Sequence, residues 1–330
     1  MLSAHIYSVG SELAKHAVLT RDILDEARFE DCTLVEKSLG INEVRQAEVS
    51  AKPSTLAIPA AQKALVSAGV PLKEIDAVIY CGIERDCSEP ATAHIIAAAL
   101  GLSPMMCFDV ANACHGFASG LHVANAMIKT GDIRHALVVT AELSSKVTRT
   151  VVDMFRSNQL HPSDIKTHVG AFTVGDAGGA MILGPGDGSN GIKKITSGSM
   201  SNYHNLCSYE INQGKLSFIM DMGKISAVTL KLVRDLVKPA YEALNWTPDD
   251  VDLFIPHQVG ERPFYKTLEL VGVSPEKSIA TYPKLGNLAS ATLPVAFDML
   301  KQQGRLKKGS NVLLGSSGSG IAVTFMGMTM

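Results

Sequence analysis

Three polar residues occupy positions from which α/β proteins do chemistry. Cys114 follows a short apolar strand expected to end near Val110, and it begins a helix of small residues that runs to Thr130. His257 directly follows another apolar strand, and Asn287 precedes a second helix of small residues. Catalytic groups of α/β proteins tend to lie at the carboxyl ends of strands. A cysteine, a histidine and an asparagine that converge at one centre indicate nucleophilic acyl chemistry.

The position of Cys114 also predicts its ionisation. A thiol at a helix N-terminus meets the positive end of the helix dipole and free N–H groups, which favour the thiolate. We therefore expect the helix start, together with His257, to lower the pKa of Cys114. Each residue has a structural interpretation as well. A free cysteine is more often a packing residue than a nucleophile, and His257 and Asn287 would then be core side chains.

An internal repeat relates the two halves of the sequence. Residues 59–82 and 239–258 each show a helix with Ala and Leu at helical spacing, then Pro, then a short apolar strand. Within them Asp76 matches Asp252. A second matching pair of segments, 127–139 and 299–314, follows at nearly the same interval along the chain. The same order and the similar interval indicate a duplicated α/β unit rather than chance similarity.

The repeat places the three polar residues relative to one another. Cys114 follows Asp76 by almost the same length of chain by which Asn287 follows Asp252. Cys114 and Asn287 therefore occupy near-equivalent helix starts in the two halves. A pseudo-two-fold axis would bring these helix starts and the strand end at His257 towards one centre.

The repeat and the apolar strands predict the architecture. The expected strands lack polar alternation, which is typical of strands buried on both faces, and helices packed on two such sheets give a layered α/β fold. We expect halves at 1–180 and 181–330 that share one core. Residues 186–191 fit G-x-G-x-x-G, but a dinucleotide site needs a helix to follow. The residues that follow, 192–196, look like a strand, so we predict a hairpin turn at 184–191.

Composition limits the function classes. The 330 residues are 46% hydrophobic and 19% charged with a net charge of −2, which is globular composition and gives no basic field for nucleic acid. The six cysteines form no C-x-x-C pair, so we expect no metal site and no permanently bound cofactor. The start of the chain lacks a signal peptide, and the uncharged stretch 90–108 contains His94, Gly101 and Pro104. We therefore expect a helix and a strand there, no membrane span, and a cytoplasmic protein.

Several segments together resemble a known family over nearly the whole chain. They are residues 109–121 around Cys114, the run 175–180 (GDAGGA), Pro256-His257-Gln258, Gly286-Asn287 and the glycine-rich tail 315–320. With the order Cys, His, Asn, they resemble the β-ketoacyl-acyl-carrier-protein synthase III family of the thiolase-fold superfamily. The resemblance implies a thiolase-like fold, with duplicated α/β halves in a five-layered αβαβα sandwich, a homodimer, and Claisen condensation of thioesters to a β-ketoacyl product.

The resemblance also implies roles for individual residues. Cys114 would be the acylated nucleophile, and His257 and Asn287 would bind the oxygen of the second thioester. The backbone N–H groups of Cys114 and Ser319 would form the oxyanion hole. Arg262 would contact coenzyme A or a carrier protein. The implied substrates are thioesters of coenzyme A or phosphopantetheine, with acyl-CoA and acyl carrier protein as partners.

The sequence departs from the family pattern at three places. The usual Trp and Arg clamp for coenzyme A is missing from 34–41, since the only tryptophan is Trp246. His115 follows the nucleophile where a small or aliphatic residue is usual. Glu89, in the stretch 85–91, stands where the standard enzyme has an aromatic residue that reaches into the partner subunit's pocket.

Glu89 leaves the exact reaction open. A malonyl donor generates its carbanion by losing carbon dioxide and needs no base, as in fatty-acid or polyketide-type synthesis. An unactivated acyl thioester needs its α-proton removed, which a desolvated carboxylate can do, and Glu89 resembles the branch that joins two acyl-CoAs head to head in olefin biosynthesis. The alternatives are a solvated, structural Glu89 and, from another class, a non-catalytic partner subunit, against which the intact Cys114, His257 and Asn287 argue.

Overall fold

Two β-sheets form the framework of the molecule. We describe a computed structural model in which residues 3–29, 36–37, 39–212 and 215–330 are placed, without the side chains of 211, 212, 215 and 216. Cys32 lies outside the described residues. So do residues 34, 35 and 38 of the stretch 34–41, where the family has its clamp for coenzyme A. The first sheet has five strands. In spatial order they are β1 (Ala4–Leu13), β7 (Ala177–Pro185), β6 (Ala136–Glu142), β4 (Ala77–Tyr80) and β5 (Met106–Asp109).

The second sheet has four strands and repeats part of this arrangement. In spatial order they are β11 (Leu253–Pro256), β12 (Asn311–Gly318), β13 (Ala322–Thr329) and β8 (Gly191–Ser199). β11 runs parallel to β12, as β4 runs parallel to β6, while β13 and β7 run antiparallel to their neighbours. Strands β4, β6 and β11 are buried along their whole length, as the missing polar alternation predicted.

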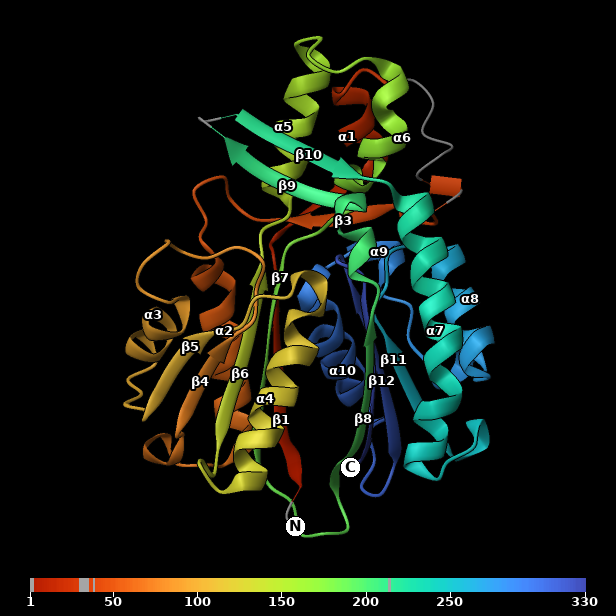
Figure 1. Cartoon of the computed structure of the whole chain (residues 1–330). Helices are drawn as coiled ribbons and strands as arrows, with labels where there is room; N and C mark the ends of the chain where they lie inside the picture. Colours follow the sequence, from red (N-terminus) through yellow and green to blue (C-terminus); the bar gives the residue numbers. More distant parts are fainter. Residues whose placement is uncertain (1–2, 30–35, 38, 213–214) are drawn as a thin grey trace.

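Helices complete five layers. α4 (Gly116–Thr130) and α10 (Thr292–Gln302) lie between the two sheets (Figure 1). Their apolar side chains share one core cluster with the inner faces of both sheets. On the outer side of the first sheet lie α2 (Pro53–Ala68) and α3 (Thr92–Ala99), and the corresponding helices of the second sheet are α7 (Met222–Leu244) and α8 (Glu261–Val271). This is the αβαβα sandwich of the thiolase-like fold.

The duplication extends to individual hydrogen bonds. The Asp76 carboxylate accepts from the N–H of His135 at 3.1 Å, and the Asp76 N–H donates to the His135 carbonyl at 2.9 Å. In the other half, Asp252 accepts from the Asn311 N–H at 2.8 Å and donates to the Asn311 carbonyl at 2.9 Å. Because His135 and Asn311 are separated along the sequence by the same interval as Asp76 and Asp252, the predicted repeat is a true structural equivalence.

The interval that separates Asp76 from Asp252 also corrects the predicted equivalence of Cys114 and Asn287. A short 3₁₀ turn precedes each central helix, η3 (Ala113–His115) before α4 and η9 (Ala289–Ala291) before α10. Ala113 and Ala289, which this interval also separates, both have φ of 46°. The position equivalent to Cys114 is therefore Ser290, and Asn287 lies before the turn rather than inside it.

The glycine-dense segment does not form a hairpin, so that prediction is wrong. β7 pairs with β1 and β6, whereas β8 pairs with β13 in the other sheet. Residues 186–190 therefore carry the chain from the first sheet to the second. No helix follows them, in agreement with the rejected dinucleotide motif. The division at 1–180 and 181–330 stays a prediction.

A smaller layer covers one end of the sandwich, at the top of Figure 1. Its elements are α1 (Thr20–Glu26), β2 (His16–Leu19), β3 (Glu43–Gln46), α5 (Ser145–Arg156), α6 (Ile165–His168), β9 (Cys207–Asn212), β10 (Lys215–Met220) and α9 (Tyr282–Leu285). The uncharged stretch 90–108 forms α3 and most of β5, as predicted. Among the placed residues no helix has the length and apolar character to cross a bilayer.

Candidate active site

Cys114 lies in the turn between β5 and α4, close to the predicted helix start. Ala113 before it has a left-handed φ of 46°, and Cys114 lines a cavity. The prediction of a lowered pKa is wrong. Burial raises the pKa of the Cys114 thiol well above its ordinary value, and the buried carboxyl of Glu142 adds to the effect. Desolvation outweighs the helix dipole because a single charge is costly where water is excluded.

His257 lies directly after β11, as predicted, and lines the same cavity. Its Nδ1 lies 3.2 Å from the Thr292 hydroxyl oxygen, which itself donates to the Ala289 carbonyl at 3.0 Å. Since that hydroxyl hydrogen is engaged, the oxygen accepts from Nδ1–H and leaves Nε2 as a free base. Burial lowers the pKa of His257 to about 4, and the nearby His115 contributes. The imidazole is therefore neutral at pH 7.

Asn287 is 4% exposed and lines the cavity with Cys114 and His257. Its Oδ1 accepts from the Ala289 N–H at 2.8 Å, so the Nδ2 amide group is the donor that remains. Gly286 before it has φ of 65°, and a Cβ there would lie 2.2 Å from the Thr173 carbonyl oxygen. Only glycine fits this close contact. The contact holds the loop that carries Asn287 against Thr173 of the first half, so Asn287 lies at the junction of the two halves.

The end of β12 lies against the nucleophile turn. A Cβ on Gly318 would lie 2.8 Å from the His115 nitrogen, so the absence of a side chain lets the two segments touch. Ser319 follows and lines both cavities that contain Cys114. The structure thus places Ser319 beside Cys114, and its role as an oxyanion donor stays a prediction.

Two cavities meet at Cys114. The first, of about 80 Å³, lies beside α7 and α8, and the second, of about 400 Å³, lies under β9 and β10. Five residues line both: Cys114, Cys207, Met220, Asn287 and Ser319. A thioester carbonyl at this junction would have one arm in each cavity.

Sequence reasoning missed two polar residues of the site. Cys207 lines both cavities, and its thiol is hydrogen-bonded to the Ser319 side chain. Glu142 lines the second cavity and is 1% exposed. Glu142 ends the apolar strand Ala136–Glu142, and a carboxylate at the end of a buried strand was a signal that could have found it. Nothing near Cys207 in the sequence indicated a site.

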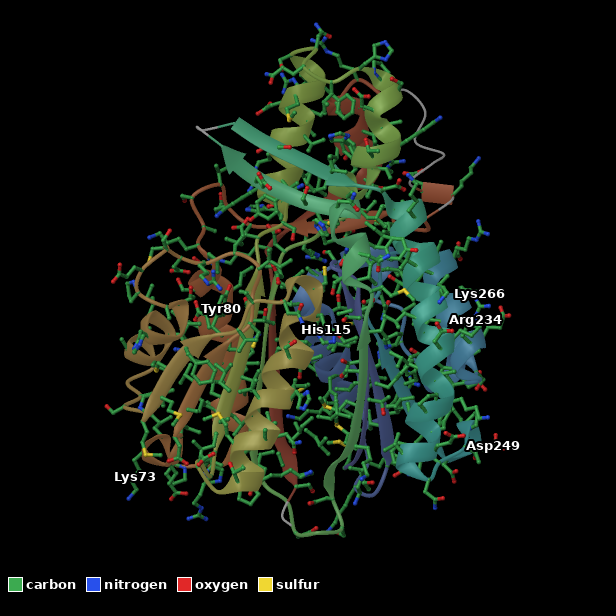
Figure 2. All side chains as sticks on the ribbon, in the orientation of Figure 1. Lys73, Tyr80, His115, Arg234, Asp249 and Lys266 are labelled. Carbon is green, nitrogen blue, oxygen red and sulfur yellow. The ribbon has the colours of Figure 1, made fainter. Side chains whose placement is uncertain are left out.

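His115 ties the nucleophile turn to the second half. Its Nε2 lies 2.8 Å from the Thr324 hydroxyl on β13, and its Nδ1 lies 2.9 Å from the Ser119 hydroxyl and 3.1 Å from the Asn112 amide nitrogen. Figure 2 shows His115 at the centre of the molecule, between the halves. Burial lowers the pKa of His115 to about 4. It lines neither cavity that contains Cys114.

Two predicted site residues lie apart from the Cys114 junction. Glu89 is exposed on the loop between β4 and α3, and it lines neither cavity of its own subunit. Arg262 is exposed in the first turn of α8, next to Pro263, which lines the first cavity. Arg262 therefore lies next to the lining of that cavity in the chain, whereas Glu89 lines neither cavity within one chain.

The fold and the arrangement of Cys114, His257 and Asn287 define a thiolase-fold condensing enzyme. Residues 108–201 match the 3-oxoacyl-[acyl-carrier-protein] synthase III family, and residues 241–329 match its C-terminal region. The chain belongs to this family and is an acyltransferase that forms carbon–carbon bonds between thioesters.

Relatives in the family have two kinds of name. The β-ketoacyl-[acyl-carrier-protein] synthase III of Aliarcobacter butzleri is 33% identical, over 87% of this chain and 86% of its own length. The acyl-CoA:acyl-CoA alkyltransferase of Shewanella oneidensis is also 33% identical, over 88% of this chain and 86% of its own length.

Solved structures agree with the fold over the whole chain. One is OleA of Xanthomonas campestris, in a variant in which one glutamate is replaced by alanine. It superposes with a TM-score of 0.93 at 25% sequence identity, and the match covers 100% of this chain and 98% of that one. Another OleA structure, a variant of one cysteine with bound lauric acid and lauroyl-CoA, has a TM-score of 0.92 at 26% identity, over 99% of each chain.

Proposed function

We propose that this enzyme joins two acyl thioesters without decarboxylation. An acyl group moves from its carrier thiol to Cys114, and the free carrier thiol leaves. A base removes the α-proton of a second acyl thioester, and the resulting carbanion attacks the carbonyl carbon of acyl-Cys114. The bond to Cys114 breaks, and a β-ketoacyl thioester is released. The acyl-CoA:acyl-CoA alkyltransferases among its relatives carry names that support this proposal.

Loading begins from a neutral thiol. Because burial raises the pKa of Cys114 and lowers the pKa of His257, the resting pair is uncharged. The free Nε2 of His257 takes the thiol proton as Cys114 attacks, so charge forms only in the transition state. The N–H groups of Cys114 and Ser319 then stabilise the oxyanion of the tetrahedral intermediate.

The second thioester is bound by Asn287. During loading, the proton that His257 took from Cys114 passes to the departing carrier thiol, so the imidazole is neutral again when the second thioester enters. Asn287 donates from its Nδ2 group to the carbonyl oxygen of the second thioester, which lowers the energy of its enolate, and His257 lines the same cavity. No metal or redox cofactor takes part in this scheme. The thioester arm of coenzyme A or a carrier protein enters through the first cavity, and Arg262 contacts the anionic end of the carrier.

Glu89 is the observation that carries the proposal. It is exposed, and its loop is held at the end of the edge strand β5, where Asp109 accepts from the N–H groups of Thr92 and Ala93 at 3.0 Å and pairs with Arg85 at 3.2 Å. A carboxylate exposed on a loop that is anchored beside a sheet edge, outside its own site, fits a role in a second subunit. There it acts as the base that removes the α-proton.

The edge strand β5 supplies the surface for that subunit. Among the strands that the structure describes, β5 pairs with β4 alone, and Met106 on it is 40% exposed beside Met105, which is 69% exposed. Open strand edges are normally covered or paired. A second copy that pairs β5 with β5 would form a two-fold dimer, and this arrangement would bring its Glu89 loop towards the second cavity, which Ala111, just after the strand, helps to line.

One experiment separates this reaction from the decarboxylative one. Purified enzyme is incubated with a panel of acyl-CoAs, with and without malonyl-carrier protein, and products are identified by mass spectrometry. The proposal predicts a β-keto product from acyl-CoAs alone, which Glu89→Gln abolishes while Cys114 is still acylated. A product formed only with the malonyl donor, with carbon dioxide release and with no effect of Glu89→Gln, would establish standard synthase III chemistry instead.

A further inference from the structure

His115, the residue after the nucleophile, is buried without touching either cavity. It is 6% exposed, and it lines neither of the cavities that contain Cys114. Figure 2 shows it at the centre of the molecule, between the two halves. A buried imidazole is costly unless its ring nitrogens are hydrogen-bonded, and here both of them have partners. The partners of the ring therefore indicate what the residue does.

These contacts fix the position of the ring proton. Nδ1 lies 3.1 Å from the amide nitrogen of Asn112, and because an amide nitrogen only donates, Nδ1 accepts. The ring hydrogen is therefore on Nε2, which lies 2.8 Å from the Thr324 hydroxyl oxygen and donates to it. The Thr324 hydroxyl lies 2.7 Å from the Ser197 hydroxyl, so its own hydrogen has an acceptor. One hydrogen-bonded chain thus runs from the turn before α4 across β13 to β8.

The hydrogen bond to Thr324 joins the two segments that carry the N–H groups of the oxyanion hole. The Cys114 N–H belongs to the turn η3, directly before His115. The Ser319 N–H belongs to the turn between β12 and β13, and Thr324 lies on β13. Gly318, next to Ser319, lies so close to the His115 nitrogen that an added Cβ would be 2.8 Å from it. The two segments are therefore held together at two points, the Gly318 contact and the hydrogen bond.

We propose that His115 is a positioning residue, which sets the separation of the Cys114 and Ser319 N–H groups through its hydrogen bond to Thr324. This inference rests on the loading step of the proposed function, in which the two N–H groups stabilise the oxyanion. Such donors are effective because they are held in place before the charge forms. A misplacement of about 1 Å can slow an enzyme about a hundredfold. The imidazole of His115 acts on this geometry and not on the substrate.

Two reactions of Cys114 separate this role from a general effect on the fold. Loading from octanoyl-CoA forms an oxyanion, whereas alkylation by iodoacetamide displaces iodide from a saturated carbon and forms none. Loading at saturating octanoyl-CoA is followed by intact-protein mass spectrometry, and alkylation on the peptide that contains Cys114. His115→Asn keeps a polar side chain that is too short to reach Thr324. We expect it to load about tenfold to a hundredfold more slowly, with its alkylation rate nearly unchanged.

Further variants assign the effect to this one hydrogen bond. Thr324→Val removes the acceptor and should slow loading as His115→Asn does. The double variant should be little slower than either single one, because both changes break the same contact. His115→Gln, whose amide nitrogen can reach the position of Nε2, should restore most of the loading rate. His122→Asn, a change at an exposed histidine of α4, is the matched control and should leave both rates unaltered.

The results that would overturn the inference are distinct. Normal loading in His115→Asn would show that the hydrogen bond does not matter to the reaction. Equal losses of loading and alkylation would show a residue that only supports the fold. Loading needs neither Glu89 nor a second thioester, so a failed condensation assay leaves these results interpretable. An unaltered enzyme that does not load octanoyl-CoA would contradict the loading step of the proposed function, and this inference with it.

Discussion

At the scale of single residues, the resting site holds its nucleophile and its base as neutral groups. Cys114 and His257 are held as a thiol and a neutral imidazole because burial penalises both charged forms. The proton transfer between them therefore accompanies the attack on the thioester and does not precede it. This also protects the resting nucleophile, since thiolates rather than thiols react with oxidants and alkylating agents.

The neutral thiol predicts how Cys114 labels with iodoacetamide. The fraction of thiolate rises with pH throughout the range below a raised pKa, so the labelling rate should rise about tenfold per pH unit between pH 7 and 9. The rate is measured by mass spectrometry of the peptide that contains Cys114, with Cys114→Ser as the background. A rate that is already constant from pH 6 upward would show a thiolate at rest and contradict a neutral nucleophile.

Glu142 predicts a pH-dependent stability. A raised pKa in the folded state means that folding favours the protonated form, so stability is full below the unfolded value near 4.5 and falls as pH rises towards about 8. The loss over this window is on the order of 2–4 kcal/mol. Glu142→Gln has no proton to lose. Thermal melts at pH 5.5 and 8 should therefore show a smaller drop in Tm for Glu142→Gln, and equal drops would count against a buried acid.

Residue types and spacing were enough to find Cys114, His257 and Asn287, because strand ends and helix starts can be recognised in the sequence. The ionisation of Cys114 was mispredicted, since the burial of a side chain depends on every layer that packs around it. Cys207 was missed for a related reason. It lies in the layer above the sandwich, and only the fold brings β9 over the helix start at Cys114.

At the scale of elements, duplication explains the placement of the site. In each half, a turn with a left-handed alanine, Ala113 or Ala289, leads into the central helix. The two helices, α4 and α10, then meet between the sheets, which brings residues of both halves to one junction. The matching Asp76 and Asp252 motifs revealed this repeat from sequence. The crossover after β7 was mistaken for a hairpin because a glycine-rich turn does not show which sheet receives the next strand.

Gly286 tests how the loop before α10 positions Asn287. Gly286→Ala adds a Cβ where φ is 65° and the Thr173 carbonyl is 2.2 Å away, so the loop must shift. We expect a loss of about 1–3 kcal/mol in unfolding free energy and a larger loss of condensation than of Cys114 loading, because Asn287 serves the second thioester. Urea denaturation and the two partial reactions measure this. Equal losses of both partial reactions would refute a role confined to the second step.

At the scale of the whole molecule, the proposed reaction requires two copies of the chain. One chain contains the nucleophile, the histidine and the asparagine around one junction, but its Glu89 lies at the sheet edge. The sequence pointed to Glu89 through its resemblance to the family. It could not show where the residue acts, because a quaternary arrangement leaves no periodic pattern in a single chain.

The open edge of β5 predicts the dimer surface. Met106→Lys puts a charge on the exposed edge strand, and such charges oppose pairing between edges. Sedimentation velocity should show monomers for Met106→Lys, together with loss of condensation. Val66→Lys is the matched control, since Val66 is 85% exposed on α2 and should leave the dimer intact. A dimeric Met106→Lys variant would place the interface elsewhere.

The central claim is that Glu89 of one subunit completes the site of its partner. The most direct test mixes two inactive variants, Cys114→Ala and Glu89→Gln, under conditions that exchange subunits. Random exchange makes about half of the dimers mixed, each with one complete site, so about a quarter of the normal condensation rate should return. If the mixture stays as inactive as its components while exchange is complete, Glu89 does not act across the interface and the claim is wrong.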